Sequence, residues 1–156
     1  MALQMGQEIS PGCQIIQVEL LASKLRKGKF DMLSDEQIEK AKKETKYSLS
    51  EPHHEHNDCI RMAYEWLDAQ TKTKNPTTKA YALKHLIENW AGRYVSTTDV
   101  DVAASMHPEI KGMYPHFNIS ARLTEPSTLR LDGLSESFKH RYREQHDPSV
   151  YKNHEK

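Results

Sequence analysis

Apolar residues recur at helical spacing in two neighbouring segments near the centre of the chain. The apolar positions of the first segment, which begins near Asn57, are Ile60, Ala63, Tyr64, Trp66 and Leu67. Those of the second segment, which ends at Gly92, are Leu83, Leu86, Ile87 and Trp90. The residues between them, 71–77, carry Lys, Thr, Asn and Pro, which interrupt regular structure. The pattern predicts two amphipathic helices joined by a loop, with Asn57 as an N-cap and both tryptophans as core anchors.

Two further helices are expected on the C-terminal side of this pair. Ser96 and Asp99 have the spacing of a capping box and predict a third helix, which must end by His107 because Pro108 follows. A fourth helix is predicted over 115–123, since proline suits the first helical position. The inward positions of these two helices are Val100, Ala103, Ala104, Phe117, Ile119 and Leu123. We expect Val100, Ala103, Ile119 and Leu123 to share one core with Leu83, Leu86, Ile87 and Trp90.

The two ends of the chain have weaker patterns. Ile15 to Leu25 predicts a short apolar helix that Gly28 stops. Ser34 and Gln37 form a second capping box, but only Ile38 and Ala41 are apolar behind it, so this helix should pack weakly. We therefore predict three parts, which are an N-terminal helical appendage with its linker (1–50), a central domain (51–146) and a flexible tail (147–156). Asp132-Gly133 is expected at the tip of a small hairpin, and Phe138 and Tyr142 on a last helix.

The order of elements in the centre is typical of a winged helix-turn-helix. The predicted elements are, in chain order, a helix, a short strand at 93–95, a capped helix, a turn, a short helix and a hairpin. The fold class expected is mainly α, with a winged-helix-like core, the N-terminal appendage and a small β-hairpin. In such modules the second helix of the pair enters the major groove of DNA. The candidate recognition helix is therefore 115–123.

The side chains outside the core of this helix have the chemistry of DNA readout. They are His116, Asn118, Ser120 and Arg122. Asn and Arg bond adenine and guanine edges, and Ser reaches bases or phosphates. Arg93, Lys111 and Arg130 are predicted to add phosphate contacts. A homodimer would double these contacts. The competing interpretation is a small helical domain that never meets DNA, in which Asn118 bonds local backbone.

A second candidate site is the run EPHHEHND at 51–58. Imidazoles and carboxylates are metal ligands, so His53, His54 and His56 are candidates for a metal site. Their spacing is nevertheless unlike that of catalytic zinc motifs, which place histidines one helical turn apart. The interpretation we prefer is an exposed loop whose acids favour the positive end of the following helix.

Composition removes several classes of function. The chain has 156 residues, with 22 Lys and Arg against 22 Asp and Glu, so no global field attracts nucleic acid or a membrane. It lacks an apolar run of about 20 residues and the features of a signal peptide, which predicts a cytoplasmic protein without a membrane partner. Cys13 and Cys59 are expected to be buried thiols. Catalytic motifs are missing, and Glu65, Asp68 and Glu88 are expected on solvated faces, so we predict no enzyme and no cofactor.

From His53 to Leu134 the chain includes HHEHNDCIRMAYEWLDAQ and STTDVDVAASMHPEIKGMYPHFNISARLTEPS. This text resembles small uncharacterised proteins of lambdoid phages and enterobacterial prophages. The resemblance implies an accessory product of a mobile element and assigns no active residue.

The preferred hypothesis is therefore a non-catalytic protein that binds double-stranded DNA in the transcription regulation or replication of a phage or prophage. An adaptor or inhibitor of a host protein is the alternative. A metal-dependent nuclease that uses the histidine cluster is third. If the contact surface for DNA is not the recognition helix, the basic residues near the N-terminal helix are the next candidates: Lys24, Arg26, Lys27 and Lys29.

Overall fold

The computed structural model describes residues 32–79 and 81–156. All elements named below belong to one compact unit, Leu33–Lys156. The helix predicted over 15–25, Cys13 and the four basic residues near that helix lie outside the described residues.

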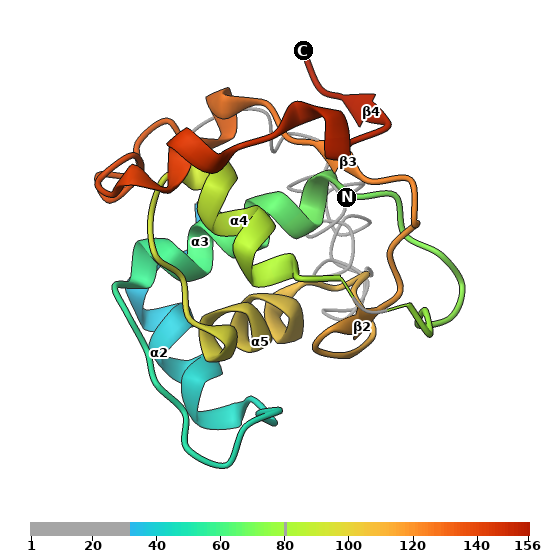
Figure 1. Cartoon of the computed structure of the whole chain (residues 1–156). Helices are drawn as coiled ribbons and strands as arrows, with labels where there is room; N and C mark the ends of the chain where they lie inside the picture. Colours follow the sequence, from blue (N-terminus) through green and yellow to red (C-terminus); the bar gives the residue numbers. More distant parts are fainter. Residues whose placement is uncertain (1–31, 80) are drawn as a thin grey trace, which may run out of the picture. The chain divides into compact units, whose positions relative to one another are not determined.

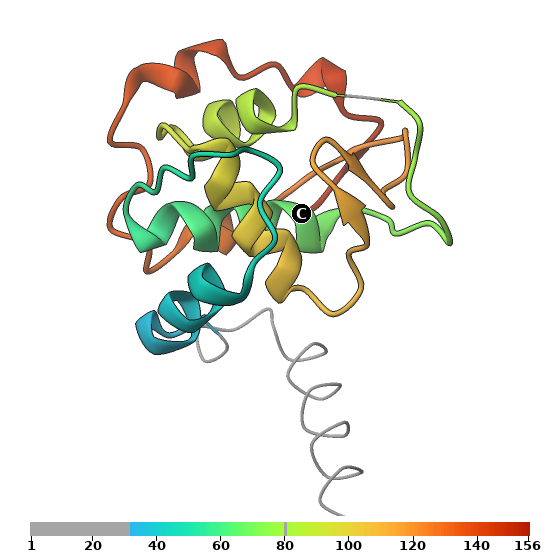
Figure 2. The same ribbon diagram turned by 90° about the horizontal axis from the view of Figure 1, so that it is seen from below.

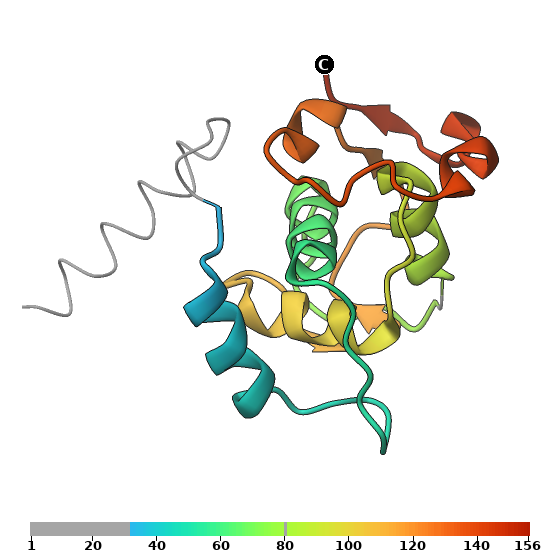
Figure 3. The ribbon, with the colours of Figure 1, turned by 90° about the vertical axis from the view of Figure 1, so that its left-hand side faces the viewer.

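Four α-helices form the larger part of the Leu33–Lys156 unit (Figure 1). They are α2 (Asp35–Glu44), α3 (Asn57–Ala69), α4 (Leu83–Ala91) and α5 (Thr97–Met106). All four are helices that the sequence predicted. Helix α3 packs on α4 and crosses α5, while α2 lies against α5 and α3 (Figure 3). None of the helices in the described residues is both long and apolar enough to span a membrane.

Local signals at the helix ends act as the sequence predicted, with one exception. Ser34 and Ser96 each form a reciprocal capping box, with Gln37 and Asp99 respectively. Helix α4 ends at Gly92, whose left-handed conformation is one that glycine adopts without a steric cost. The exception is α3, whose N-cap is His56 and not Asn57. The His56 side chain accepts a hydrogen bond from the backbone N–H of Asp58 at 2.9 Å, the role we assigned to an asparagine.

The core contains almost every apolar position of the predicted helical faces. Seven of the eight residues that were expected to share one core are buried: Leu83, Ile87, Trp90, Val100, Ala103, Ile119 and Leu123. Leu86 itself is only partly buried. Cys59 is buried as expected. Trp66 and Trp90 are confirmed as core anchors, and each indole N–H finds an acceptor, the Tyr151 hydroxyl and the Pro126 carbonyl.

The described residues of the predicted appendage, 32–50, and the predicted tail, 147–156, each contribute a side chain to this core. Ile38 of α2 is completely buried, so even a helix with few apolar residues docks on α3 and α5. Tyr151 is also buried near the C-terminus. Two residues further on, β4 (Asn153–His154) pairs in parallel with β3 (Thr124–Glu125). The compact unit therefore includes α2 and extends to the end of the chain.

The helix predicted over 115–123 does not form. In its place, β2 (His116–Phe117) pairs antiparallel with β1 (Gly112–Met113), and Ile119 makes an isolated bridge to Lys72. In the extended chain Phe117 and Ile119 enter the core two residues apart, and Asn118 between them is also buried. The segment lies beside the loop at 71–79, whose backbone supplies its hydrogen-bond partners (Figure 2).

The C-terminal part of the unit consists of short segments that cover α3 and α4 (Figure 3). They include three 3-10 helices, η3 (Thr128–Leu131), η4 (Arg141–Gln145) and η5 (Pro148–Val150). The hairpin expected at Asp132-Gly133 is wrong, because that stretch makes successive turns after η3. The last helix expected from Phe138 is also wrong in its start, since Phe138 has a φ of 62°, which an α-helix does not allow. The fold is mainly helical, with one small antiparallel sheet at β1–β2.

Candidate nucleic-acid interface

Asn118, predicted to bond adenine, is instead a buried link between two loops. Its Oδ1 accepts from the backbone N–H of Lys111 at 2.6 Å. Its amide nitrogen donates to the carbonyls of Thr73 and Glu109, both at 3.0 Å. These bonds use both N–H donors of the amide within the protein. Asn118 therefore holds the loop at 71–79 against the segment that begins near residue 109, and it is not positioned to read a base.

Arg130, predicted to contact phosphate, is surrounded by carboxylates. Its guanidinium donates to Glu65 at 2.9 Å, to Asp68 at 3.0 Å and to Glu155 at 2.7 Å. His107 donates through Nε2 to Asp68 at 2.8 Å. Burial raises the pKa of Asp68, but the bonds from His107 and Arg130 outweigh it and hold that pKa well below its usual range. Arg130 thus pairs with three carboxylates of the protein, and its charge is not offered to a ligand. Arg93, also predicted to contact phosphate, is buried and pairs with Glu136 at 3.1 Å.

Several carboxylates expected on solvated faces belong to such contacts. Glu88 is almost completely buried on α4, where it accepts from Lys84 at 2.5 Å and from His85 at 3.1 Å. Its Oε1 also accepts from the backbone N–H of Val95 at 3.3 Å. Glu88 was predicted to lie on a solvated face of α4. The chain that follows α4 folds back onto Glu88 and buries it.

The remaining predicted residues lie at the surface around the β1–β2 hairpin. Lys111, His116 and Arg122 are exposed, and Ser120 is half-buried. The His116 ring donates through Nδ1 to the Thr77 carbonyl at 3.2 Å. Ser120 accepts a hydrogen bond from the backbone N–H of Arg122 at 3.2 Å. Three cationic or titratable side chains that the sequence singled out thus stay available to a partner, although no helix carries them.

The loop at 71–79 adds charge to this surface. Three backbone hydrogen bonds attach it to the chain after the hairpin: Thr73 N to Asn118 O at 2.8 Å, Thr77 N to Phe117 O at 3.2 Å and Ser120 N to Thr71 O at 2.8 Å. Gly112 faces Pro76 so closely that an added Cβ would lie 3.1 Å from that ring. Because the loop runs beside the hairpin, its exposed Lys74 and Lys79 join Lys111 and His116.

We name the exposed set Lys74, Lys79, Lys111, His116 and Arg122 the cationic edge. Within residues 32–79 and 81–156, none of its four Lys and Arg side chains takes part in an ion pair. The segments that build it, 69–87 and 107–124, contain a single acid, Glu109. A chain with no net charge therefore carries a locally positive surface, of the kind that attracts phosphates.

Lys74 and Lys79 were missed by the sequence analysis. A signal for them was present, since residues 69–87 contain four lysines and no Asp or Glu. This run of lysines did not stand out because acidic and basic residues are equal in number over longer stretches of the chain. The position of the run beside Lys111 depends on the contacts of Asn118, which the sequence did not indicate.

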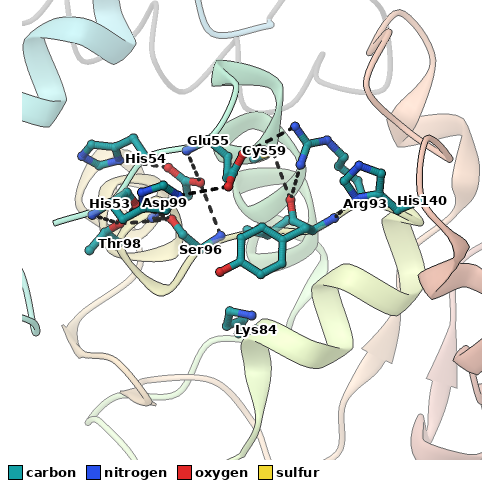
Figure 4. Close-up of polar contacts among 12 residues, drawn as sticks. His53, His54, Glu55, Cys59, Lys84, Arg93, Ser96, Thr98, Asp99 and His140 are labelled. Carbon is teal, nitrogen blue, oxygen red and sulfur yellow. Dashed lines mark hydrogen bonds and ion pairs between the residues drawn. The ribbon is translucent and has the colours of Figure 1, made fainter.

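The histidine cluster at 53–56 is part of the structure of the α5 N-terminus (Figure 4). His54 donates through Nδ1 to the buried carboxylate of Asp99 at 2.9 Å, and its Nε2 lies 2.9 Å from the Tyr47 hydroxyl. The backbone N–H of Glu55 donates to the same carboxylate at 3.2 Å. The His53 carbonyl accepts from Ser96 Oγ at 2.7 Å and also from the Thr98 hydroxyl.

The three candidate ligands diverge in this arrangement. The ring of His53 faces Glu55, the ring of His54 faces Asp99, and His56 caps α3. In the part of the chain that the structure describes, no three His, Cys, Asp or Glu side chains are grouped to hold a metal ion. The predicted exposed loop is present in part, because His53 and His56 are exposed, but this segment is also bonded to α5 and its N-cap through both backbone and side chains.

No protein-family model, curated protein or solved structure matches this chain.

Proposed function

We propose that the chain is a non-catalytic protein that binds double-stranded DNA through the cationic edge. The observation that carries this proposal is the set of four exposed Lys and Arg side chains without an ion pair in the described residues, in segments that contain only Glu109 as an acid. Contacts from Lys and Arg to phosphates supply most of the affinity of proteins for DNA. They carry little sequence information, so we expect weak discrimination between DNA sequences.

The element proposed to touch DNA is the β1–β2 hairpin. Helix α5 is buried along most of its length, so it offers no free face to a major groove. The hairpin follows α4 and α5 in the chain and projects Met113, whose side chain is 48% exposed, between Lys111 and His116. Apolar side chains beside cations are typical of contacts in the minor groove. In this proposal the hairpin acts as the wing of a winged-helix-like protein that lacks a recognition helix at 115–123.

The biological setting proposed is regulation or replication of a mobile element in the cytoplasm. It is supported by the resemblance of residues 53–134 to small proteins of phages and prophages. Binding to phosphates without strong sequence preference fits an accessory protein in either process.

The decisive measurement is fluorescence anisotropy with a labelled 20-base-pair duplex over a series of salt concentrations. Replacing Lys74, Lys79 and Lys111 together by Gln should lower the affinity and also flatten its salt dependence. Each lost phosphate contact reduces the slope of log affinity against log salt by about 0.9. The matched control is the triple variant Lys40→Gln, Lys43→Gln and Lys46→Gln, which removes the same charge from exposed positions on and after α2. Equal losses in both variants, or no duplex binding even at low salt, would contradict the proposal.

An adaptor or inhibitor of a host protein is the second candidate. Its supporting observation is Leu129, which is 68% exposed on η3, together with Val150 on η5. This candidate replaces DNA binding if the duplex fails to bind. In that case a Leu129→Asp variant should abolish capture of the protein partner, while the lysine variant should not affect it.

A further inference from the structure

Three rings are in contact where the chain runs past the end of α4, and a fourth, Phe138, precedes His140 by two residues in the segment 138–142. We name Tyr94, Phe138, His140 and Tyr142 the aromatic surface. The ring centroids of Tyr94 and Tyr142 are 6.5 Å apart, and those of His140 and Tyr142 are 6.2 Å apart. Phe138 is 51% exposed, His140 is exposed, and both tyrosines are half-buried. Large rings are usually placed inside a protein, so a group of them at the surface indicates a contact site.

Backbone bonds hold this surface in place. The N–H of Phe138 donates to the Ala91 carbonyl, and the N–H of His140 donates to the Gly92 carbonyl, both at 2.8 Å. The His140 ring accepts in turn from the backbone N–H of Tyr94 at 3.1 Å, which places His140 beside Arg93 (Figure 4). The segment is thus attached to the C-terminal end of α4 at three points. Rings that are already held in position lose little entropy when they bind a ligand.

Phe138 has an unfavourable backbone conformation, and its side chain is not buried deeply enough to offset the energetic cost. Its φ of 62° lies in the left-handed region, which bulky residues rarely adopt. A glycine would be free of this strain, yet the position holds a phenylalanine that is 51% exposed. The guanidinium of Arg143 lies 5.9 Å from the centre of the ring. Strained residues of this kind are concentrated at functional sites.

Cations stand between and beside the rings. Lys139 and Arg141 alternate with Phe138, His140 and Tyr142 along the chain, and both are exposed. The nearby acid Glu136 is held by Arg93 at 3.1 Å and reaches Lys139 at 3.6 Å. Glu144 is a second exposed acid in the segment. The ligand that matches alternating rings and cations has flat apolar faces joined by negative charges.

From this geometry we propose that the aromatic surface binds single-stranded nucleic acid. Unpaired bases stack on Phe138 and Tyr142, while the phosphates between them contact Lys139 and Arg141. A duplex keeps its base faces stacked internally and cannot use such rings, so the ligand must be unpaired. The site shares no residue with the cationic edge and does not rest on duplex binding there. Stacking tolerates any base, so we expect little sequence preference.

The test measures the anisotropy of a labelled oligonucleotide of twelve thymidines at low salt. Phe138→Gly and Tyr142→Leu should each weaken its binding roughly tenfold, because stacking on one aromatic side chain contributes about that much. Phe138→Gly also relieves the positive φ, so its melting temperature should not fall, and a loss of binding is then not a loss of fold. Leu49→Ala, which removes an exposed apolar side chain elsewhere, is the control and should bind like the wild type.

The two nucleic-acid proposals are separated by crossing probes with variants. The lysine variant of the cationic edge should lose the duplex and keep the oligonucleotide, and Phe138→Gly should do the reverse. Absence of oligonucleotide binding to the wild type, or unchanged binding in both ring variants, overturns the inference. A loss of both probes in the lysine variant with no change in Phe138→Gly overturns it as well, since one charged surface then accounts for all binding.

Discussion

The helical part of the unit, 57–106, and the part that follows, 107–156, are built by different means. In the first part, three helices of nine to thirteen residues bury continuous apolar faces. In the second part, the regular segments have two to five residues. Each of these is too short to be stable alone and depends on distant partners. The local sequence pattern therefore determines the structure of the first part, whereas long-range polar contacts stabilise the second.

Gln70 illustrates the second kind of contact. Its side-chain amide donates to the Thr124 carbonyl at 2.9 Å, and its Oε1 accepts from the Thr124 N–H at 2.9 Å. The Gln70 side chain thus makes the pair of backbone contacts that a neighbouring strand would make, to a residue 54 positions away in sequence. Asn118 and Arg130 do the same for the loop at 71–79 and for the C-terminal segment.

The largest effect is expected from damage to the helical part. Leu67→Ala removes a completely buried side chain of α3 and should lower the free energy of unfolding by about 2 to 5 kcal/mol. Leu86→Ala, in the partly buried position on α4, should cost clearly less because less apolar surface is lost. Chemical denaturation of the two variants and the wild type measures both values. Equal costs would mean that helical spacing, and not burial, decides the stability of this part.

A smaller and more local effect is expected from Asn118→Ala. The variant leaves the Lys111 N–H and the Thr73 and Glu109 carbonyls without their partner, at a cost of about 1 to 3 kcal/mol. Hydrogen exchange should accelerate at 71–79 and 109–120, while the amides of α3 keep their protection. Acceleration spread evenly over the whole unit would show that the two parts do not differ in how they are held.

The smallest effect is expected from acid. The pKa of Asp68 is held low, so its bonds to His107 and Arg130 contribute stability that is present above the ordinary pKa of an aspartate and is lost as pH falls towards the lowered value. Between pH 5 and 3 the wild type should lose roughly 1 to 2 kcal/mol that Asp68→Asn does not lose. Urea denaturation at several pH values measures this difference. Parallel pH profiles of the two proteins would refute the assignment.

The candidate interface was predictable in part. Lys111, His116 and Arg122 were singled out by residue type, and all three are exposed, because charged side chains on a surface segment stay in water whatever its secondary structure. Asn118 and Arg130 were singled out on the same grounds and proved to be internal. Residue type alone does not distinguish a donor that faces a ligand from one that bonds a carbonyl or carboxylate across the fold.

Helices α2 to α5, the capping boxes of α2 and α5 and the apolar faces that form the core could be predicted from the sequence alone. These depend on neighbours three or four residues apart, which a single sequence contains. Only the tertiary structure decided that 116–119 is extended, that the loop at 71–79 lies beside it, and that Phe138 stays in solvent. The partners of these residues are dozens of positions away in the chain. A short apolar segment becomes helical or extended according to the backbone groups that those distant partners leave for it to pair with.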